Sequence, residues 1–347
     1  MEIAPPPVPS AGRRVVLDRP GVVAVRDADA APPPGSGQAL VRLRLGGICG
    51  SDLSAFRGTS PLVSYPRVLG HELLVDVARC PDRPDLEGRR AVVSPLLPCG
   101  ACRACRRGRS NCCADLRVMG VHTDGGLAGA TLVAASQLHA VPDGVSDETA
   151  VLAEPLTVAY HAVQRGAVDA GQVAVVLGAG AIGLLVARLL VGARGARVWA
   201  TDVDPWRLQV AERMGAHPLP GDPAAMLRTL ADATRGELAD VVFEATGHPA
   251  CTRLATDLVG HAGRIVLIGW NRGPTEVDTV ALMRKEVDLL GSRNSVDAFP
   301  PVLRLLEGGL VDPGALITHR FPMEEAGAAL RLLDAGGGRA LKVLIGA

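Results

Sequence analysis

Aromatic residues are scarce in this chain of 347 residues, because Phe, Trp and Tyr together make up only 3% of it. So few aromatic rings leave little material for the stacking platforms that bind nucleic-acid bases. A surplus of one charge is also missing, since Lys+Arg and Asp+Glu each total 36 and the net charge is zero. This balance removes the usual electrostatic argument for binding nucleic acid or a membrane surface. We therefore expect neither kind of partner.

A signal-peptide pattern is absent as well. The first 14 residues, Met1 to Arg14, are proline-rich and contain no apolar h-region. Five of the eight cysteines lie in one window of fifteen residues, Cys99 to Cys113. In a chain without a secretion signal, such clustering favours metal ligands over disulfides and a reducing, cytoplasmic location. The length suffices for two domains, and the 48% apolar content is enough for large cores.

The cysteine cluster has a specific spacing. Cys99, Cys102, Cys105 and Cys113 form the pattern C-x2-C-x2-C-x7-C. Four thiolates at such short spacing are typical of a closed, tetrahedral structural zinc site. By spacing alone, Cys112 could replace Cys113 as the fourth ligand. Arginines are interleaved with these cysteines, and on a neutral protein we interpret them as the solvated face of a loop rather than as a nucleic-acid contact.

A glycine motif lies near the middle of the chain, between two predicted strands. The β-branched run Val173 to Leu177 predicts a buried strand, and Arg197 to Thr201 predicts a second strand that ends at Asp202. The residues of the G-x-G-x-x-G motif that follow the first strand are Gly178, Gly180, Ala181, Ile182 and Gly183. Such a motif binds a pyrophosphate at a helix N-terminus, and a carboxylate about 20 residues further on accepts hydrogen bonds from the adenosine ribose.

Two other interpretations of this stretch are possible. Residues 173 to 192 are almost all apolar and about the ~20 residues needed to span a bilayer. Arg188, four glycines and the lack of flanking basic clusters favour a buried strand–helix unit instead. A glycine-rich turn in some other parallel sheet is the remaining alternative, and Asp202 argues against it.

A second candidate metal site combines Cys49, His71 and Glu72. A thiolate, an imidazole and a carboxylate are a plausible zinc ligand set that leaves one position for water or substrate. Each residue alone also fits a role in the core, because lone cysteines and histidines are more often buried structural groups.

The hydrophobic pattern predicts the fold class. Strand-like segments recur at 240–244, 264–269 and 286–291 with helical segments between them, which indicates an α/β fold with a doubly wound parallel sheet. The N-terminal part is strand-rich, and residues 341–345 predict a closing strand. Helices are expected at 150–166, 207–215, 299–310 and 323–335.

The order of these motifs resembles the zinc-dependent medium-chain alcohol and polyol dehydrogenases over nearly the whole chain. The motifs that carry the resemblance are Gly47-Ile48-Cys49-Gly50-Ser51-Asp52, Gly70-His71-Glu72, the four-cysteine lobe, Glu154-Pro155-Leu156 and the glycine motif with Asp202. The sorbitol, threonine and sugar-acid branch is the most similar, and Gly291-Ser292-Arg293-Asn294 looks like the hexonate oxidoreductases. The stretch from Cys49 to Gly58 also resembles aminocyclitol dehydrogenases.

The resemblance implies an architecture and a set of cofactors. It implies a GroES-like, β-rich catalytic domain over residues 1–155 with a structural zinc lobe at 95–115. A Rossmann NAD-binding domain would span 156–297, and 298–347 would return to the catalytic domain. Two zinc ions, one catalytic and one structural, and NAD are the implied cofactors. The family also implies a homodimer or homotetramer.

The resemblance also assigns roles to single residues. Cys49, His71 and Glu72 would hold the catalytic zinc, and Glu154 would bind it directly or through water. Cys113, not Cys112, matches the fourth structural ligand. Asp202 matches the acid that selects NAD, and Arg207 the basic residue beside the adenosine ribose. In one departure, Ser54 stands where many relatives carry the histidine that ends the proton relay.

These expectations define a reaction. Zinc lowers the pKa of a bound alcohol, which then gives up a hydride to the nicotinamide. Ser51 is the expected first proton acceptor, with a helix N-cap as its alternative role. The predicted function is NAD(H)-dependent interconversion of a secondary alcohol and a ketone on a polyhydroxylated, hexonate or polyol type of substrate. The alternatives are an aminocyclitol dehydrogenase and, from another class, a catalytically silent NAD-binding regulatory protein.

Overall fold

The computed structural model describes residues 12–270, 273–336 and 339–347. The chain forms two compact units. The first comprises residues 1–154, 299–307 and 316–347, and the second comprises 155–298 and 308–315. The proline-rich start, Met1 to Arg14, lies mostly outside the described residues.

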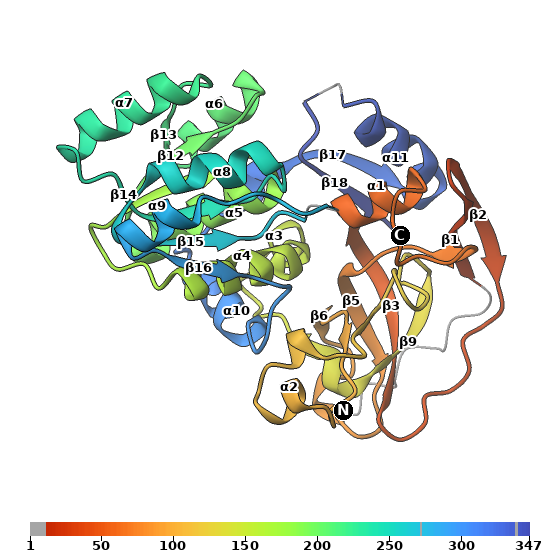
Figure 1. Cartoon of the computed structure of the whole chain (residues 1–347). Helices are drawn as coiled ribbons and strands as arrows, with labels where there is room; N and C mark the ends of the chain where they lie inside the picture. Colours follow the sequence, from red (N-terminus) through yellow and green to blue (C-terminus); the bar gives the residue numbers. More distant parts are fainter. Residues whose placement is uncertain (1–11, 271–272, 337–338) are drawn as a thin grey trace. The chain divides into compact units, whose positions relative to one another are not determined.

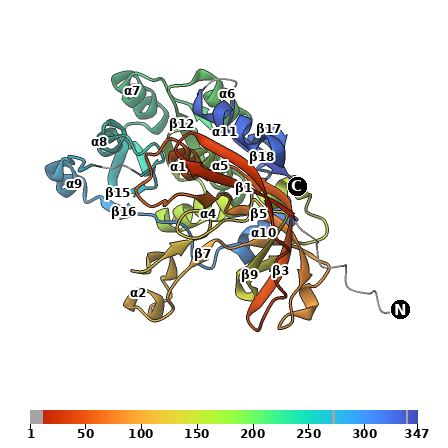
Figure 2. The same cartoon turned by 90° about the vertical axis from the view of Figure 1, so that its right-hand side faces the viewer.

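The second unit contains the parallel sheet that the sequence predicts (Figures 1 and 2). Its strand order is β13-β12-β11-β14-β15-β16, so the order reverses between β11 and β14. The strands are β11 (Val173–Leu177), β12 (Arg197–Thr201), β13 (His217–Pro218), β14 (Ala239–Glu244), β15 (Val259–Leu267) and β16 (Asp288–Gly291). All five residues of β11 are buried, which explains its continuous apolar run.

Helices cover both faces of this sheet. Those of the second unit are α4 (Ala153–Gly166), which starts in the first unit, α5 (Ala181–Leu189), α6 (Pro205–Arg213), α7 (Pro223–Thr234), α8 (Pro249–Leu258) and α9 (Thr279–Lys285). Val242 of β14 packs in one cluster with residues of α7 and α8. The next residue, Phe243, points to the other face, where it limits the space at Gly166 of α4. The sheet is therefore doubly wound.

The apolar run 173–192 is split between a strand and a helix, β11 and α5. Within the described residues, no helix is long and apolar enough to cross a membrane.

The first unit is built mainly of antiparallel strands. The principal sheet has the order β10-β6-β5-β3-β18-β17, and β9 also pairs with β3. A smaller sheet has the order β2-β1-β4, and β7 pairs with β8. The strands are β1 (Gly12–Arg19), β2 (Val22–Ala28), β3 (Gln38–Gly47), β4 (Arg67–Val68), β5 (Glu72–Arg79), β6 (Arg90–Val93), β7 (Leu96–Leu97), β8 (Arg117–Val118), β9 (Ala130–Ala134), β10 (Leu138–Ala140), β17 (Ile317–Pro322) and β18 (Lys342–Gly346).

The helices of the first unit are short, and several boundaries in the chain differ from the prediction. They are α1 (Gly50–Phe56), α2 (Arg103–Arg106), α3 (Asp147–Val151), α10 (Phe299–Glu307) and α11 (Ala326–Asp334). The helix predicted over 150–166 is confirmed as α4 from Ala153 to Gly166, but its start is wrong, because α3 ends at Val151 and is a separate helix. In the second unit, the strand predicted from 286 starts only at Asp288, because Glu286 caps α9 in the left-handed region at φ 52°.

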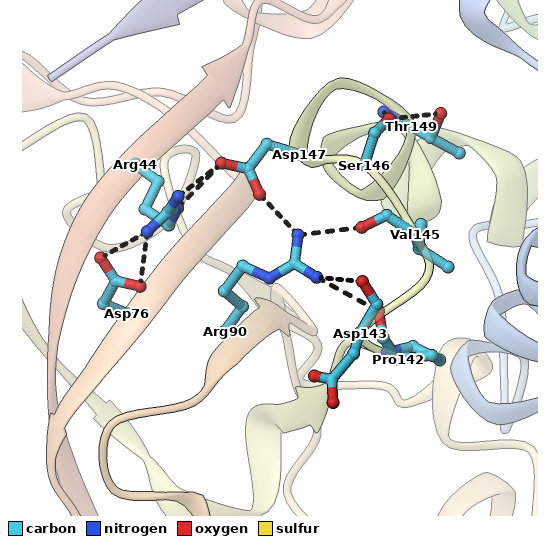
Figure 3. Close-up of polar contacts among 9 residues, drawn as sticks. All are labelled: Arg44, Asp76, Arg90, Pro142, Asp143, Val145, Ser146, Asp147 and Thr149. Carbon is cyan, nitrogen blue, oxygen red and sulfur yellow. Dashed lines mark hydrogen bonds and ion pairs between the residues drawn. The ribbon is translucent and has the colours of Figure 1, made fainter.

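An ion-pair network fixes the start of α3 to the principal sheet (Figure 3). Arg44 of β3 donates to Asp147 at 2.7 Å and to Asp76 of β5 at 3.0 Å. Arg90 of β6 donates to the other Asp147 oxygen at 2.6 Å and to the Val145 carbonyl at 2.9 Å. Burial would raise the pKa of Asp147, but the hydrogen bonds from the two arginines hold it below its usual value. The network anchors the segment that leads directly to Glu154.

Candidate active site

Three potential metal ligands meet in the first unit. Cys49 is the N-cap of α1, directly after β3, while His71 and Glu72 lie at the start of β5. β3 and β5 are paired, with Gly47 opposite Glu72. One ligand atom from each of the three residues lies within 4.8 Å of the others. The structure thus brings together a sulfur, a nitrogen and an oxygen donor, which suits one zinc ion.

Two glycines create the space that these side chains occupy. A Cβ on Gly47 would lie 2.0 Å from a carboxylate oxygen of Glu72. Gly70, which precedes His71, has φ 99°, and a Cβ there would lie 2.5 Å from Leu127. Glycine is needed at Gly70 for its backbone angle and at Gly47 for the close approach of the Glu72 side chain.

Asp52 connects two of the three ligands. One of its oxygens accepts a hydrogen bond from the Cys49 backbone N–H at 2.9 Å, and the other lies 3.7 Å from Nδ1 of His71. The opposite ring nitrogen, Nε2, lies 3.4 Å from the Ser51 hydroxyl. Carboxylates behind metal-bound imidazoles commonly fix the ring orientation in this way. The alternative role of Ser51 as helix N-cap is wrong, because Cys49 holds that position.

Lys342 of β18 is a site residue that the sequence analysis missed. Its Nζ lies 2.6 and 2.7 Å from the two oxygens of Glu72 and 3.2 Å from the Ile48 carbonyl. The side chains of Lys342 and Glu72 are 3% and 1% exposed, so the ion pair is fully desolvated. Glu72 therefore faces two candidate cations, the lysine ammonium and a metal ion.

The electrostatics of this cluster fit a bound cation. Burial would lower the pKa of His71, but the charges of Asp52 and Cys49 raise it well above its usual value. Burial raises the pKa of Glu154 to about 7, and the charges of His71 and Glu72 also act on it. This carboxyl is therefore near the cluster without supplying one of its three ligand atoms. Burial also raises the pKa of Asp52, so two carboxyl groups near the ligand atoms are held towards their neutral forms. A divalent metal would supply the missing positive charge.

The second metal-type cluster lies in the lobe between β7 and β8. The sulfur atoms of Cys99, Cys102, Cys105 and Cys113 all lie within 4.8 Å of one another, with Cys102 and Cys105 3.6 Å apart. Tetrahedral zinc with Zn–S bonds of about 2.3 Å requires sulfur separations of roughly 3.8 Å. Cys112 is exposed and outside the cluster, whereas Cys113 is buried. The geometry favours Cys113 as the fourth ligand.

Replacing the two adjacent cysteines one at a time tests this assignment. Cys113→Ser should lower the zinc content by one ion per chain and reduce stability by several kcal/mol, because metal binding contributes directly to folding of such lobes. Cys112→Ser is the matched control and should change neither quantity. Zinc is measured by atomic emission and stability by thermal unfolding. The reverse pattern would assign the fourth ligand to Cys112.

The glycine motif forms a tight turn between β11 and α5 in the second unit. Gly178 has φ 98°, and a Cβ on it would lie 2.7 Å from the Thr246 side chain. A Cβ on Gly183 would lie 1.9 Å from the Gly178 carbonyl, so only glycine allows α5 to pack so closely. Gly180 faces open space, and no side chain caps the helix that starts at Ala181 and Ile182. These free backbone N–H groups fit a pyrophosphate.

Asp202 lies at the end of the neighbouring strand, and Arg207 lies in the helix that follows it. Asp202 follows β12, and its carboxylate accepts hydrogen bonds from the backbone N–H groups of Ala179 and Asp204 at 2.7 and 2.9 Å. Arg207 of α6 lies 3.7 Å from the Asp204 carboxylate. Asp202 therefore links the glycine turn to the loop in which a ribose would bind, a role in positioning that the sequence motif alone does not reveal.

Comparisons with known proteins agree with this geometry. Residues 35–143 match the family model of the alcohol dehydrogenase GroES-like domain, and residues 181–308 match that of the zinc-binding dehydrogenases. The starvation-sensing protein RspB of Escherichia coli K12 is 32% identical, over 96% of this chain and 98% of that protein. L-Galactonate-5-dehydrogenase of the same strain is 36% identical, over 84% of this chain and 86% of that protein.

A solved structure extends the match to three dimensions. The crystal structure of an alcohol dehydrogenase (rspB) from Escherichia coli CFT073, complexed with NADH, superimposes with a TM-score of 0.91 at 31% identity. The match covers 98% of this chain and 100% of the other. This chain therefore belongs to the zinc-dependent medium-chain alcohol and polyol dehydrogenases, with a Rossmann domain and a GroES-like domain, and it is a dehydrogenase.

Proposed function

We propose that this enzyme uses zinc and NAD(H) to interconvert a secondary alcohol and a ketone on a polyhydroxylated substrate of the hexonate or polyol type. The observation that carries the proposal is the cluster of Cys49, His71 and Glu72, whose ligand atoms lie within 4.8 Å of one another and of which His71 and Glu72 are buried. The substrate class is supported by the relative named as an L-galactonate dehydrogenase.

The residues around the cluster would divide the work. Cys49, His71 and one of the carboxylates Glu72 and Glu154 would hold the zinc, which when bound acts as a Lewis acid on the substrate oxygen. Asp52 lies behind the His71 ring, 3.7 Å from its Nδ1, and would orient the ring electrostatically. Ser51 lies on the ligand side of the ring, 3.4 Å from Nε2, where its hydroxyl can accept the proton of the substrate alcohol. The Ser54 hydroxyl instead donates to the Gly50 carbonyl at 3.0 Å, so it contributes to α1.

The cofactor would bind to the second unit. The open backbone at Gly180 and the first N–H groups of α5 would hold the pyrophosphate, and Asp202 would accept from the hydroxyls of the adenosine ribose. A carboxylate at this position repels the additional phosphate of NADP. Arg207, 3.7 Å from Asp204, would lie beside the same ribose.

Replacing Asp202 by asparagine tests the cofactor preference. The variant keeps the side-chain shape and one acceptor oxygen but loses the charge, so the ratio of kcat/KM for NAD to that for NADP should fall by about tenfold or more. Asp222→Asn removes the carboxylate that caps α7, away from this loop, and serves as the control with an unchanged ratio. Equal kcat/KM values for the two cofactors in the unaltered enzyme would contradict the preference for NAD.

A substrate screen tests the function itself. The purified enzyme is supplied with NAD and a panel of hexonates, polyols and aminocyclitols, and NADH absorbance is followed. Turnover of a hexonate or polyol supports the proposal, whereas turnover confined to aminocyclitols would favour the alternative substrate class. Zinc stoichiometry is measured on the same sample. Two ions per chain fit the enzyme proposed here, and one ion without turnover would fit a silent NAD-binding regulatory protein.

We also propose that the enzyme is a homodimer or homotetramer. β16 lies at the edge of the parallel sheet, and its Leu289 is exposed, as are Trp270, Val280 and Met283 of the adjacent segments. An open strand edge with exposed apolar side chains is a surface on which a second copy could pair. Light scattering of the purified enzyme measures its oligomeric state.

A further inference from the structure

Glu244 is a buried carboxylate that the proposed reaction does not use. It is the last residue of β14, it is 1% exposed, and it lies opposite Leu177 of β11. No ion pair among the residues that the structure describes involves it. Burying a charge without an opposite charge is costly, so an unpaired carboxylate at this depth calls for an explanation.

The contacts of Glu244 explain how it is held, but they do not neutralise it. Its Oε1 accepts hydrogen bonds from the backbone N–H groups of Thr246 at 2.8 Å and Gly247 at 3.0 Å, and from the Thr246 hydroxyl. Its Oε2 also accepts from Gly247, at 3.1 Å. Among the described residues, all of these donors are neutral, so the hydrogen bonds bring no compensating positive charge. They fix the carboxylate in place under the loop 245–248.

This loop lies at the point where the strand order reverses. Thr246 contacts Gly178 of the pyrophosphate turn, and the backbone N–H of Ala245 donates to the Leu177 carbonyl at 2.9 Å. The loop also packs against the one after β15, because a Cβ on Gly269 would lie 2.0 Å from the Gly247 nitrogen. A dinucleotide crosses the sheet at such a reversal.

The position of Asp202 decides which half of the dinucleotide would face Glu244. Asp202 follows β12, so the adenosine half belongs to the side of β12 and β13. The nicotinamide half must then lie on the side of β14 and β15. The nicotinamide ring carries one positive charge in NAD+ and none in NADH. A fixed negative charge on that side would therefore distinguish the two redox forms.

We propose that Glu244 is the counter-charge of the oxidised nicotinamide, so that it strengthens binding of NAD+ relative to NADH. The inference rests on the dinucleotide site proposed above and adds a positioning residue that sets its redox preference. The attraction between two opposite unit charges roughly 10 Å apart, at an effective dielectric constant of ~20, changes a binding constant by about a factor of ten or more. A change of that size can be measured directly by binding.

The experiment is calorimetric titration of the full, zinc-loaded enzyme with NAD+, NADH and ADP-ribose, which lacks the nicotinamide. Glu244→Gln should weaken NAD+ binding by about tenfold while NADH and ADP-ribose change by less than about twofold. The matched control is Asp240→Asn on the same strand, where Asp240 accepts a hydrogen bond from the backbone N–H of Val173 at 2.7 Å. It removes a carboxylate from the opposite end of β14 and should leave all three affinities unchanged.

The outcomes separate this inference from the proposed function. If Glu244→Gln weakens the binding of NAD+ and NADH equally, so that the ratio of the two affinities is unchanged, the role of Glu244 is overturned. The cofactor site itself would still stand. Failure of the unaltered enzyme to bind any of the three ligands overturns the cofactor site itself. If Glu244→Gln does not fold, Thr246→Lys places a cation beside the carboxylate from an exposed position. That variant must lower the affinity ratio of NAD+ to NADH, and an unchanged ratio overturns the inference.

Discussion

Replacement of Cys49 by serine is expected to abolish turnover while leaving the fold intact. Cys49 supplies the only sulfur donor of its cluster, and a serine hydroxyl is a much poorer zinc ligand than a thiolate. Loss of the Lewis acid removes several kcal/mol of transition-state stabilisation, so kcat/KM should fall by at least about a thousandfold. The zinc content should fall from two ions per chain to one. Activity is measured through the absorbance of NADH, and the zinc content is measured by atomic emission.

The matched control is Cys251→Ser, the same chemical change at a half-buried thiol of α8 in the other unit. It should retain both zinc ions and most of the activity. NADH binding provides the check on folding, because the glycine turn lies in the second unit and should bind the dinucleotide normally in the Cys49 variant. Retained turnover after loss of Cys49 would refute the zinc mechanism.

The parallel sheet was the part of the fold most readily predicted from the sequence. The strands predicted at Val173 to Leu177 and Arg197 to Thr201 have the same bounds in the structure. Both are short, buried and bounded by residues that interrupt a strand, so the local signal and the tertiary environment agree. The break at Leu152 was not predicted, because the apolar spacing runs on through both helices and only the tertiary structure separates them.

The residues that the sequence analysis missed act over long distances in the chain. Lys342 reaches Glu72 only because β18 pairs with β3, which in turn pairs with β5. A lysine in an otherwise apolar closing strand was the available signal, since this chain contains only two lysines, Lys285 and Lys342. Glu244 gave a similar signal as an acid at the end of a buried strand. Its role depends on loops that meet only in the folded sheet.

Replacement of Lys342 by methionine is expected to destabilise the first unit by about 3–5 kcal/mol. The change leaves the Glu72 carboxylate buried, at 1% exposure, without the ammonium that lies 2.6 Å from it. Hydrogen exchange followed by mass spectrometry, on peptides from β3, β5 and β18, measures the free energy of opening of this unit separately from the other. The double variant Glu72→Gln/Lys342→Met removes both charges and should recover most of the loss.

Lys285→Met is the control for loss of a lysine as such. Its Nζ donates to the carbonyls of Thr256 and Val259, both at 2.8 Å, so its removal leaves no buried charge and should cost only about 1 kcal/mol. A loss below about 1 kcal/mol for Lys342→Met would contradict the expectation. It would mean that Glu72 has another cation as its partner in the folded enzyme. Because a metal ion is the other candidate cation, that result would favour Glu72 over Glu154 as the third protein ligand of the catalytic zinc.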